Sequence, residues 1–363
     1  MRGSKAKSGK TKRETRLAAH PIASKAPAPT ASTAACPLSS KVIPVFRHAL
    51  LRWYGRHRRD LPWRKTCDPY RIWLSEIMLQ QTRVAAVLDH YRLFLERFPD
   101  VETLAAASEE AVLAAWSGLG YYRRARMLRQ CAREIVLEHD GRFPENAKAL
   151  RALPGIGRYT AAAIASIAFN QPAAVVDGNV ERVLQRFLGR ELEQEQNWAC
   201  AQELMSKARP GDFNQAMMEL GATVCLPREP HCTSCPVRQW CRAQGEIPLA
   251  RTSVRQTQKQ IWCALERRDH HVRLVQRPKA ASLMADMWEL PQWGDDPRVL
   301  VDATPWRTFR HSITVTNYTV HVLRRPGRNG IPGARGRWIE IDKIQHLPIT
   351  GLTRKILKAD GVI

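Results

Sequence analysis

The stretch LRALPGIGRYTAAAIASIAF, residues 150–169, carries the pattern that decides the fold. Its centre, PGIG at 154–157, is a turn sequence between two apolar segments, and an Ala-rich helix is predicted to begin near Tyr159. Glycines at Gly155 and Gly157 let the backbone approach a ligand closely, and free N–H groups at a helix N-terminus favour an anion. The pattern therefore fits a DNA phosphate held by a helical hairpin, and it also fits an ordinary turn between helices.

The composition favours a polyanionic partner. The chain has 363 residues, with 57 Lys and Arg against 34 Asp and Glu, which gives a formal net charge of +23. A field of this sign attracts nucleic acid. The alternative is a basic tail on an otherwise neutral enzyme, but most of the excess remains when residues 1–41 are left out.

The periodicity of the apolar residues divides the chain into four segments. Residues 1–41 are basic and rich in Ala, Ser and Pro, and we expect them to be disordered. Residues 42–245 repeat apolar side chains at helical spacing, with Gly and Pro between short helices. Residues 246–258 are polar and without a pattern, which predicts a linker. Residues 259–363 alternate with a period of two and end in a helix, which predicts a smaller α+β domain.

A second stretch, CLPREPHCTSCPVRQWC at residues 225–241, holds four of the nine cysteines. A disulfide framework needs an oxidising compartment, and the basic start of the chain lacks the apolar core of a secretory signal. No apolar stretch is long enough for a membrane span either. We therefore expect a metal site in a reducing compartment, with zinc and an iron–sulfur cluster both open, on Cys225, Cys232, Cys235 and Cys241.

Several motifs together resemble one superfamily. LPGIGRYTA, VVDGNVERV and the cysteine spacing resemble the helix-hairpin-helix DNA glycosylases of the endonuclease III superfamily. Within it, WLSEIMLQQTRV, GLGYYRRAR and the second domain are similar to the adenine DNA glycosylases, the MutY family. The resemblance covers residues 42–350. It implies a mostly α glycosylase fold with an iron–sulfur cluster loop, followed by a smaller α+β Nudix-like domain.

The resemblance also implies a cofactor, a partner and a location. One [4Fe–4S] cluster per chain would sit on the four cysteines as a structural clip, and the loop between the first two would present Arg228 to a phosphate. The implied partner is double-stranded DNA in which adenine lies opposite 8-oxoguanine or guanine, acted on in base excision repair. We expect a monomer without membrane contact, cytoplasmic and nucleoid-associated if the chain is bacterial.

Two carboxylates are expected to carry the chemistry. A base must leave the stack, be protonated as it departs, and leave a sugar cation that a carboxylate stabilises. Glu76 lies among apolar residues such as Trp73 and Ile77, where desolvation would raise its pKa, although a helical Glu is more often solvated. Asp177 fits an N-cap, whose N–H donors would also favour the ionised form. By resemblance Glu76 is the acid, Asp177 the stabilising carboxylate and Asn179 an orienting neighbour.

Tyr159 bears on the reaction type. Relatives that resemble endonuclease III carry a Lys there, whose amine forms a Schiff base with the sugar. A tyrosine forms none, so the resemblance implies a monofunctional glycosylase that leaves an abasic site. Gln81, with Tyr121 or Tyr122, resembles the wedge that the family inserts into the base stack, while ordinary packing is the alternative for either tyrosine.

The second domain resembles the recognition domain of the family. The metal-binding Nudix box is missing after Pro291, so a pyrophosphatase site is not expected. The family reads 8-oxoguanine with a Phe-Ser-His loop, and this chain offers Phe309, Arg310 and His311, with Arg where Ser is usual.

Two other functions stay open at this point. A bifunctional glycosylase with lyase activity, like endonuclease III, would need an amine nucleophile that Tyr159 does not supply. A non-catalytic DNA-binding protein containing zinc would need no pairing of Glu76 with Asp177.

Overall fold

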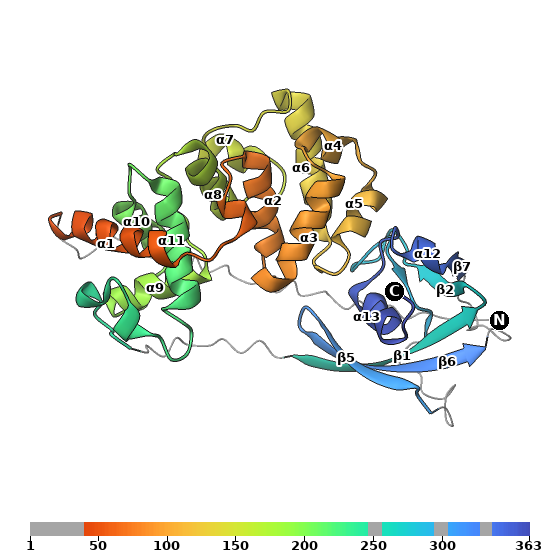
Figure 1. Cartoon of the computed structure of the whole chain (residues 1–363). Helices are drawn as coiled ribbons and strands as arrows, with labels where there is room; N and C mark the ends of the chain where they lie inside the picture. Colours follow the sequence, from red (N-terminus) through yellow and green to blue (C-terminus); the bar gives the residue numbers. More distant parts are fainter. Residues whose placement is uncertain (1–39, 246–255, 294–303, 327–335) are drawn as a thin grey trace, which may run out of the picture. The chain divides into compact units, whose positions relative to one another are not determined.

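The computed structural model describes residues 40–245, 256–293, 304–326 and 336–363 (Figure 1). The predicted disordered tail lies almost wholly outside the described residues, as does most of the predicted linker. The first strand begins at Thr257, inside the stretch that the sequence predicted as linker. No helix in the described part of the chain combines the length and apolar character needed to cross a bilayer.

Residues 40–245 are helical, as their periodicity predicts. Three short 3-10 helices, Pro62–Arg64, Cys232–Ser234 and Arg238–Trp240, accompany the α-helices of this region. In chain order the α-helices are α1 (Val42–His57), α2 (Pro69–Leu79), α3 (Val84–Arg97), α4 (Val101–Ala106), α5 (Glu109–Trp116), α6 (Arg123–His139), α7 (Ala147–Ala152), α8 (Arg158–Phe169), α9 (Gly178–Leu188), α10 (Gln194–Leu204) and α11 (Pro210–Thr223).

The helices form two apolar cores with α8 between them. Trp73 and Trp116 are buried in the core that α2 to α6 surround, and Phe46 and Phe213 in the core of α1 and α9 to α11. The Ala-rich α8 contacts α2, α7 and α11, because small side chains allow close approach on several faces. At Gly211 of α11 a Cβ would lie 2.8 Å from a backbone oxygen of α8. This close packing fixes where α8 starts relative to α2 and α11.

The predicted hairpin is present. α7 ends at Ala152, the turn follows, and α8 begins at Arg158, one residue before the predicted start. Gly155 has a φ of +75° and packs so tightly on α6 that a Cβ would lie 2.8 Å from the Cβ of Met127. An L side chain rarely adopts that backbone conformation, so both conditions favour glycine.

The C-terminal part is α+β, as predicted, with one sheet in the strand order β3-β2-β1-β6-β5. β1 and β6 pair in parallel, and β5 and β6 form an antiparallel hairpin. Helix α13 packs on the sheet through Ile356 and Leu357. The elements are β1 (Thr257–Arg268), β2 (His271–Gln276), β3 (Trp288–Glu289), β4 (Gln292–Trp293), β5 (Arg307–Ile313), β6 (Thr316–Pro326), β7 (Arg337–Glu340), α12 (Ile341–Ile344) and α13 (Gly351–Ala359).

Candidate active site

Glu76 is a buried acid. It lies in the last turn of α2 and is only 6% exposed. Burial raises the pKa of Glu76 to about 7, since the ionised form loses its hydration, and the negative charge of Asp177 adds to the effect. A hydrogen bond from Tyr159 and the positive charge of Arg64 act in the opposite direction. The pKa of Glu76 is thus raised, as its apolar neighbours in the sequence predict. A carboxyl group with this pKa can donate a proton near neutral pH.

Asp177 is the N-cap of α9, as the sequence predicts. Its Oδ1 accepts hydrogen bonds from the backbone N–H groups of Asn179 and Val180 over 3.0 and 2.8 Å. Its Oδ2 accepts from Nδ2 of Asn179 over 2.9 Å. The carboxylate is therefore held in one orientation by three donors. Two of them are backbone N–H groups in the first turn of the helix, which have no acceptor within the helix itself.

Tyr159 is the third residue of the candidate site, beside Glu76 and Asp177. It lies in the first turn of α8, and its hydroxyl donates a hydrogen bond to the sulfur of Met218 over 3.2 Å and lies within hydrogen-bonding reach of the carboxyl of Glu76. Burial raises the pKa of Tyr159 well above its usual range, and the charges of Glu76 and Asp177 raise it further. The tyrosine is thus a neutral donor at neutral pH. The structure brings Glu76, Tyr159 and Asp177 together from three different helices.

Three charged residues in this region went unnoticed in the sequence. Glu219 of α11 is fully buried, and Arg59 and Arg64 each approach its carboxylate to 2.7 Å. Burial opposes ionisation, but the hydrogen bonds from both arginines outweigh it and lower the pKa of Glu219 to about 2. Arg64 is also near enough to Glu76 to lower its pKa. The sequence feature that could have indicated the buried Glu219 is its position as the only charged residue in the apolar run MMELGA.

Arg182 connects this group to the cysteine loop. Its Nη2 donates to Oδ1 of Asn179 over 2.8 Å and its Nε to the carbonyl oxygen of Cys225 over 2.8 Å. Nη2 also donates to the carbonyl oxygen of Gly221 over 2.7 Å. Sequence reasoning missed this residue as well, although its position three residues after Asn179 places both on one face of α9.

The four predicted cysteine ligands line one small pocket. Nη1 of Arg186 lies 3.5 Å from Sγ of Cys225, and Nη2 donates to the carbonyl oxygen of Pro227, so α9 holds the cysteine loop by its backbone. Within the described residues, no group of three or more His, Cys, Asp or Glu side chains is arranged around a single metal ion. Four thiols around one pocket are the donor set of a [4Fe–4S] cluster, which spans more space than one ion. Arg228 is exposed on this loop.

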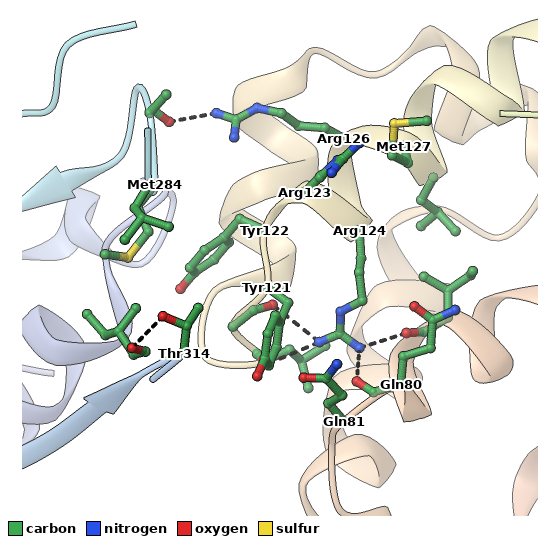
Figure 2. Close-up of a pocket in the computed structure, with 18 of the residues that line it drawn as sticks. Gln80, Gln81, Tyr121, Tyr122, Arg123, Arg124, Arg126, Met127, Met284 and Thr314 are labelled. Carbon is green, nitrogen blue, oxygen red and sulfur yellow. Dashed lines mark hydrogen bonds between the residues drawn. The ribbon is translucent and has the colours of Figure 1, made fainter. Parts of the chain in front are cut away.

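A pocket of about 1040 Å³ gathers several predicted DNA-contacting residues (Figure 2). Gln81, Tyr121 and Gly155 border it. Tyr121 is 48% exposed, whereas Tyr122 is 5% exposed and its hydroxyl donates to a backbone oxygen of the C-terminal domain, that of Ile349. The prediction that either tyrosine enters the base stack therefore narrows to Tyr121, because Tyr122 is a packing residue.

The hairpin glycines differ in their surroundings. Glycine at 155 is favoured both by its backbone conformation and by the contact with α6. A Cβ built on Gly157, the N-cap of α8, would meet no heavy atom of the described residues within 4 Å. Nothing in the described fold therefore demands glycine at 157, and a close approach by a ligand stays the prediction there.

The three predicted recognition residues lie on strand β5 and not on a loop. Because side chains alternate along a strand, Phe309 points into the apolar core and is only 6% exposed, while Arg310 is exposed. Phe309 as a base-reading residue is therefore corrected to a core residue. His311 borders the pocket with Gln81 and Tyr121, and burial lowers its pKa, helped by the charge of Lys355.

Comparisons with known proteins agree with this geometry. Residues 74–210 match the HhH-GPD family, described as HhH-GPD superfamily base excision DNA repair protein. The adenine DNA glycosylase of Homo sapiens is 49% identical over 220 residues, which cover 56% of this chain and 40% of that protein. The adenine DNA glycosylase of Arabidopsis thaliana is 40% identical over 296 residues, 68% of this chain and 47% of that protein. The chain thus spans less than half the length of these two relatives.

A solved structure extends the comparison. A thermostable thymine-DNA glycosylase matches with a TM-score of 0.53 and 33% sequence identity, over 56% of this chain and 97% of that structure. Nearly the whole of that structure therefore aligns with part of this chain. Together with the hairpin and the buried acid, this match shows that the chain belongs to the HhH-GPD superfamily of helix-hairpin-helix glycosylases, within which the curated relatives it resembles are adenine DNA glycosylases.

Proposed function

We propose that the chain is a monofunctional adenine DNA glycosylase that hydrolyses the N-glycosidic bond of adenine opposite 8-oxoguanine or guanine in double-stranded DNA, as a step of base excision repair. The observation that carries this proposal is the buried carboxyl of Glu76, with a pKa of about 7, hydrogen-bonded to Tyr159 and close to the capped carboxylate of Asp177. The choice of adenine is supported by the names of the curated relatives.

The reaction follows from the two carboxyl groups. Once adenine has left the stack, Glu76 donates its proton to the base, and the electron pair of the bond between sugar and base goes to the departing adenine. The sugar is left as a cation, which the negative charge of Asp177 stabilises. Water then adds to C1′ and gives a proton to the ionised Glu76. Asn179 holds Asp177 in place throughout through its amide hydrogen bond.

Tyr159 supports hydrolysis over strand cleavage. A lyase needs an amine that attacks C1′ and forms a Schiff base, and a tyrosine hydroxyl cannot do so. The hydroxyl instead lies within hydrogen-bonding reach of Glu76 and helps to hold the acid in position. The product is then an abasic site in an intact strand.

The proposed cofactor is one [4Fe–4S] cluster on Cys225, Cys232, Cys235 and Cys241, where four thiolates would fix the loop that exposes Arg228. Anaerobically purified protein should contain about four iron atoms per chain. Cys241→Ser should lose this iron, while Cys67→Ser, at an exposed cysteine outside the set, should retain it. Stoichiometric zinc without iron in the parent would reject the cluster.

The proposed partner is duplex DNA, bound by a monomer. The excess of basic residues, the hairpin with Gly155 and Gly157, and the exposed Arg228 support phosphate binding. Gln81 and Tyr121 at the pocket, with Arg310 and His311 on β5, support contact near the mispair. For a bacterial chain we propose a cytoplasmic, nucleoid-associated protein.

One incubation tests the function. The protein is mixed with duplexes that carry adenine opposite 8-oxoguanine or guanine, and the strands are analysed with and without alkali. We expect free adenine, with strand breaks only after alkali. Breaks without alkali would indicate a bifunctional lyase, and binding without release of adenine would indicate a non-catalytic DNA-binding protein.

A further inference from the structure

Arg124 bridges two segments of the chain at the pocket. It lies in the first turn of α6, and its guanidinium points between Gln80 and Tyr121 (Figure 2). Nη2 also donates to Oγ1 of Thr82 over 3.2 Å. Over distances of 2.6 to 3.2 Å, the guanidinium donates to five carbonyl oxygens, those of Ile77, Met78, Gln80, Leu119 and Gly120.

The two bridged segments carry strained residues at corresponding places. Gln81 has a φ of 55° and Tyr121 a φ of 47°, both in the left-handed region that side chains other than glycine rarely adopt. The carbonyls of Gln80 and Gly120, which Arg124 holds, belong to the peptide groups that directly precede them. Such conformations persist only where neighbouring groups hold them. One side chain therefore supports both strained positions.

The charge of Arg124 suits this place. Burial lowers the pKa of Arg124 to about 10, so the guanidinium stays protonated at neutral pH. The carbonyls at the C-terminal end of α2 have no partner within their helix and carry partial negative charge, which a cation stabilises. The cation also lies over the rings of Trp116 and Tyr121, 5.3 and 5.6 Å from their centroids.

We propose that Arg124 is a positioning residue for base eversion: it fixes the spacing between the exposed side chains of Gln81 and Tyr121 and so holds them ready to enter the base stack. The inference rests on the proposed function, because only a protein that everts a base needs this spacing. Arg124 is not placed to touch the reacting atoms. Its effect is expected on the unstacking step, before the proton transfer from Glu76.

The test isolates eversion from chemistry. All proteins carry Glu76→Gln, which blocks proton donation, and the duplex carries 2-aminopurine, whose fluorescence rises on unstacking, opposite 8-oxoguanine. Arg124→Met removes the bridge while keeping most of the length of the side chain. Arg129→Met is the matched control, since Arg129 of the same helix also holds a loop carbonyl, that of Ala107, over 2.6 Å. Far-UV circular dichroism and melting temperature report on folding for each protein.

We expect the fluorescence rise to slow by about 100-fold in Arg124→Met, the scale on which a misplaced group costs rate, and to stay within about twofold in Arg129→Met. Duplex affinity should change much less, because phosphate contacts dominate it. A purely structural role would lower the melting temperature and leave the eversion rate of the folded fraction unchanged.

The outcomes separate the inference from the function on which it rests. No fluorescence rise with the Glu76→Gln protein itself would reject base eversion, and the inference with it. A normal rise in both this protein and the Arg124→Met variant would reject the inference alone. If Arg124→Met does not fold, Arg124→Lys decides: its single ammonium group cannot reach both segments, so eversion should slow by about tenfold. An unchanged rate in that variant would overturn the proposal.

Discussion

Nε of Arg182 donates a hydrogen bond to the carbonyl oxygen of Cys225 over 2.8 Å. The same guanidinium donates to Asn179, whose amide donates to Oδ2 of Asp177. A continuous series of hydrogen bonds therefore joins the cysteine loop to the carboxylate that the proposed mechanism places against the sugar cation. The cysteine loop and Asp177 are therefore connected through Arg182, and a substitution at Arg182 should affect the properties of both.

Replacing Arg182 with Gln should therefore impair two properties together. The variant loses the bridge between Asn179 and Cys225, so we expect excision to fall by about 10- to 100-fold, the range typical of groups that orient a ligand or catalytic residue. Iron content per chain should fall as well. Single-turnover excision and iron analysis measure the two effects, with Arg190→Gln, at an exposed arginine just after α9, as the control. Full excision with full iron content in the Arg182 variant would show that the bridge is dispensable.

Glu76→Gln should make the protein more stable at alkaline pH. The pKa of Glu76 is about 7 in the folded chain and 4.5 ordinarily, so the folded state binds this proton more tightly than the unfolded state does. The stability that the protonated acid contributes is fully present below pH 4.5 and is lost as the pH rises through 7. A glutamine at this position does not ionise, so the variant does not lose stability in this way as the pH rises. From pH 4.5 to 8 the variant should gain about 3 kcal/mol in free energy of unfolding relative to the parent.

Urea unfolding of both proteins at several pH values measures this difference. The same variant should bind the mispaired duplex and lose excision by several orders of magnitude, because it has no proton to transfer. A difference in stability that does not change with pH would mean that Glu76 is solvated. Near-normal excision would remove it from the catalytic role.

Tyr159→Lys tests the reaction class. The position lies beside Glu76 and Asp177, so an amine placed there should reach C1′ if the sugar lies at the candidate site. Burial lowers the pKa of a lysine and leaves part of it unprotonated. Borohydride should then trap a covalent adduct with DNA that is absent or far weaker in the parent. Equal trapping in the parent would identify another lysine as a nucleophile, and excision without trapping in the variant would place position 159 out of reach of the sugar.

Tyr121 and Tyr122 should behave differently although they are adjacent. Tyr121→Ala removes an exposed ring, so we expect slower excision with a free energy of unfolding within about 0.5 kcal/mol of the parent. Tyr122→Ala empties a buried site and should cost about 3 to 5 kcal/mol of stability. Chemical denaturation and single-turnover excision separate the two effects. A large loss of stability at 121, or none at 122, would reverse the assignment.

Local signals predicted much of the molecule from the sequence. The hairpin with Gly155, the N-cap at Asp177 and the change from helical to strand period each depend on residues a few positions apart, whose backbone preferences act within one turn. At Phe309 to His311 the resemblance to the family implied a loop, and that expectation was wrong. That stretch is a strand because it pairs with β6 in an antiparallel hairpin, which places Phe309 opposite Val320 and His311 opposite Tyr318.

Tertiary packing assembled the site from residues that the sequence had largely identified. The sequence by itself determined which helix starts with Asp177 and that Glu76 has apolar neighbours, because both follow from adjacent residues. Only the packing of α8 against α2 and α11 brought Tyr159 to Glu76, and only the fold paired Glu219 with Arg64 and Arg182 with Cys225. The two partners of each of these pairs lie far apart along the chain. Their contacts depend on how buried surfaces fit together, which the spacing of residues in a sequence does not specify.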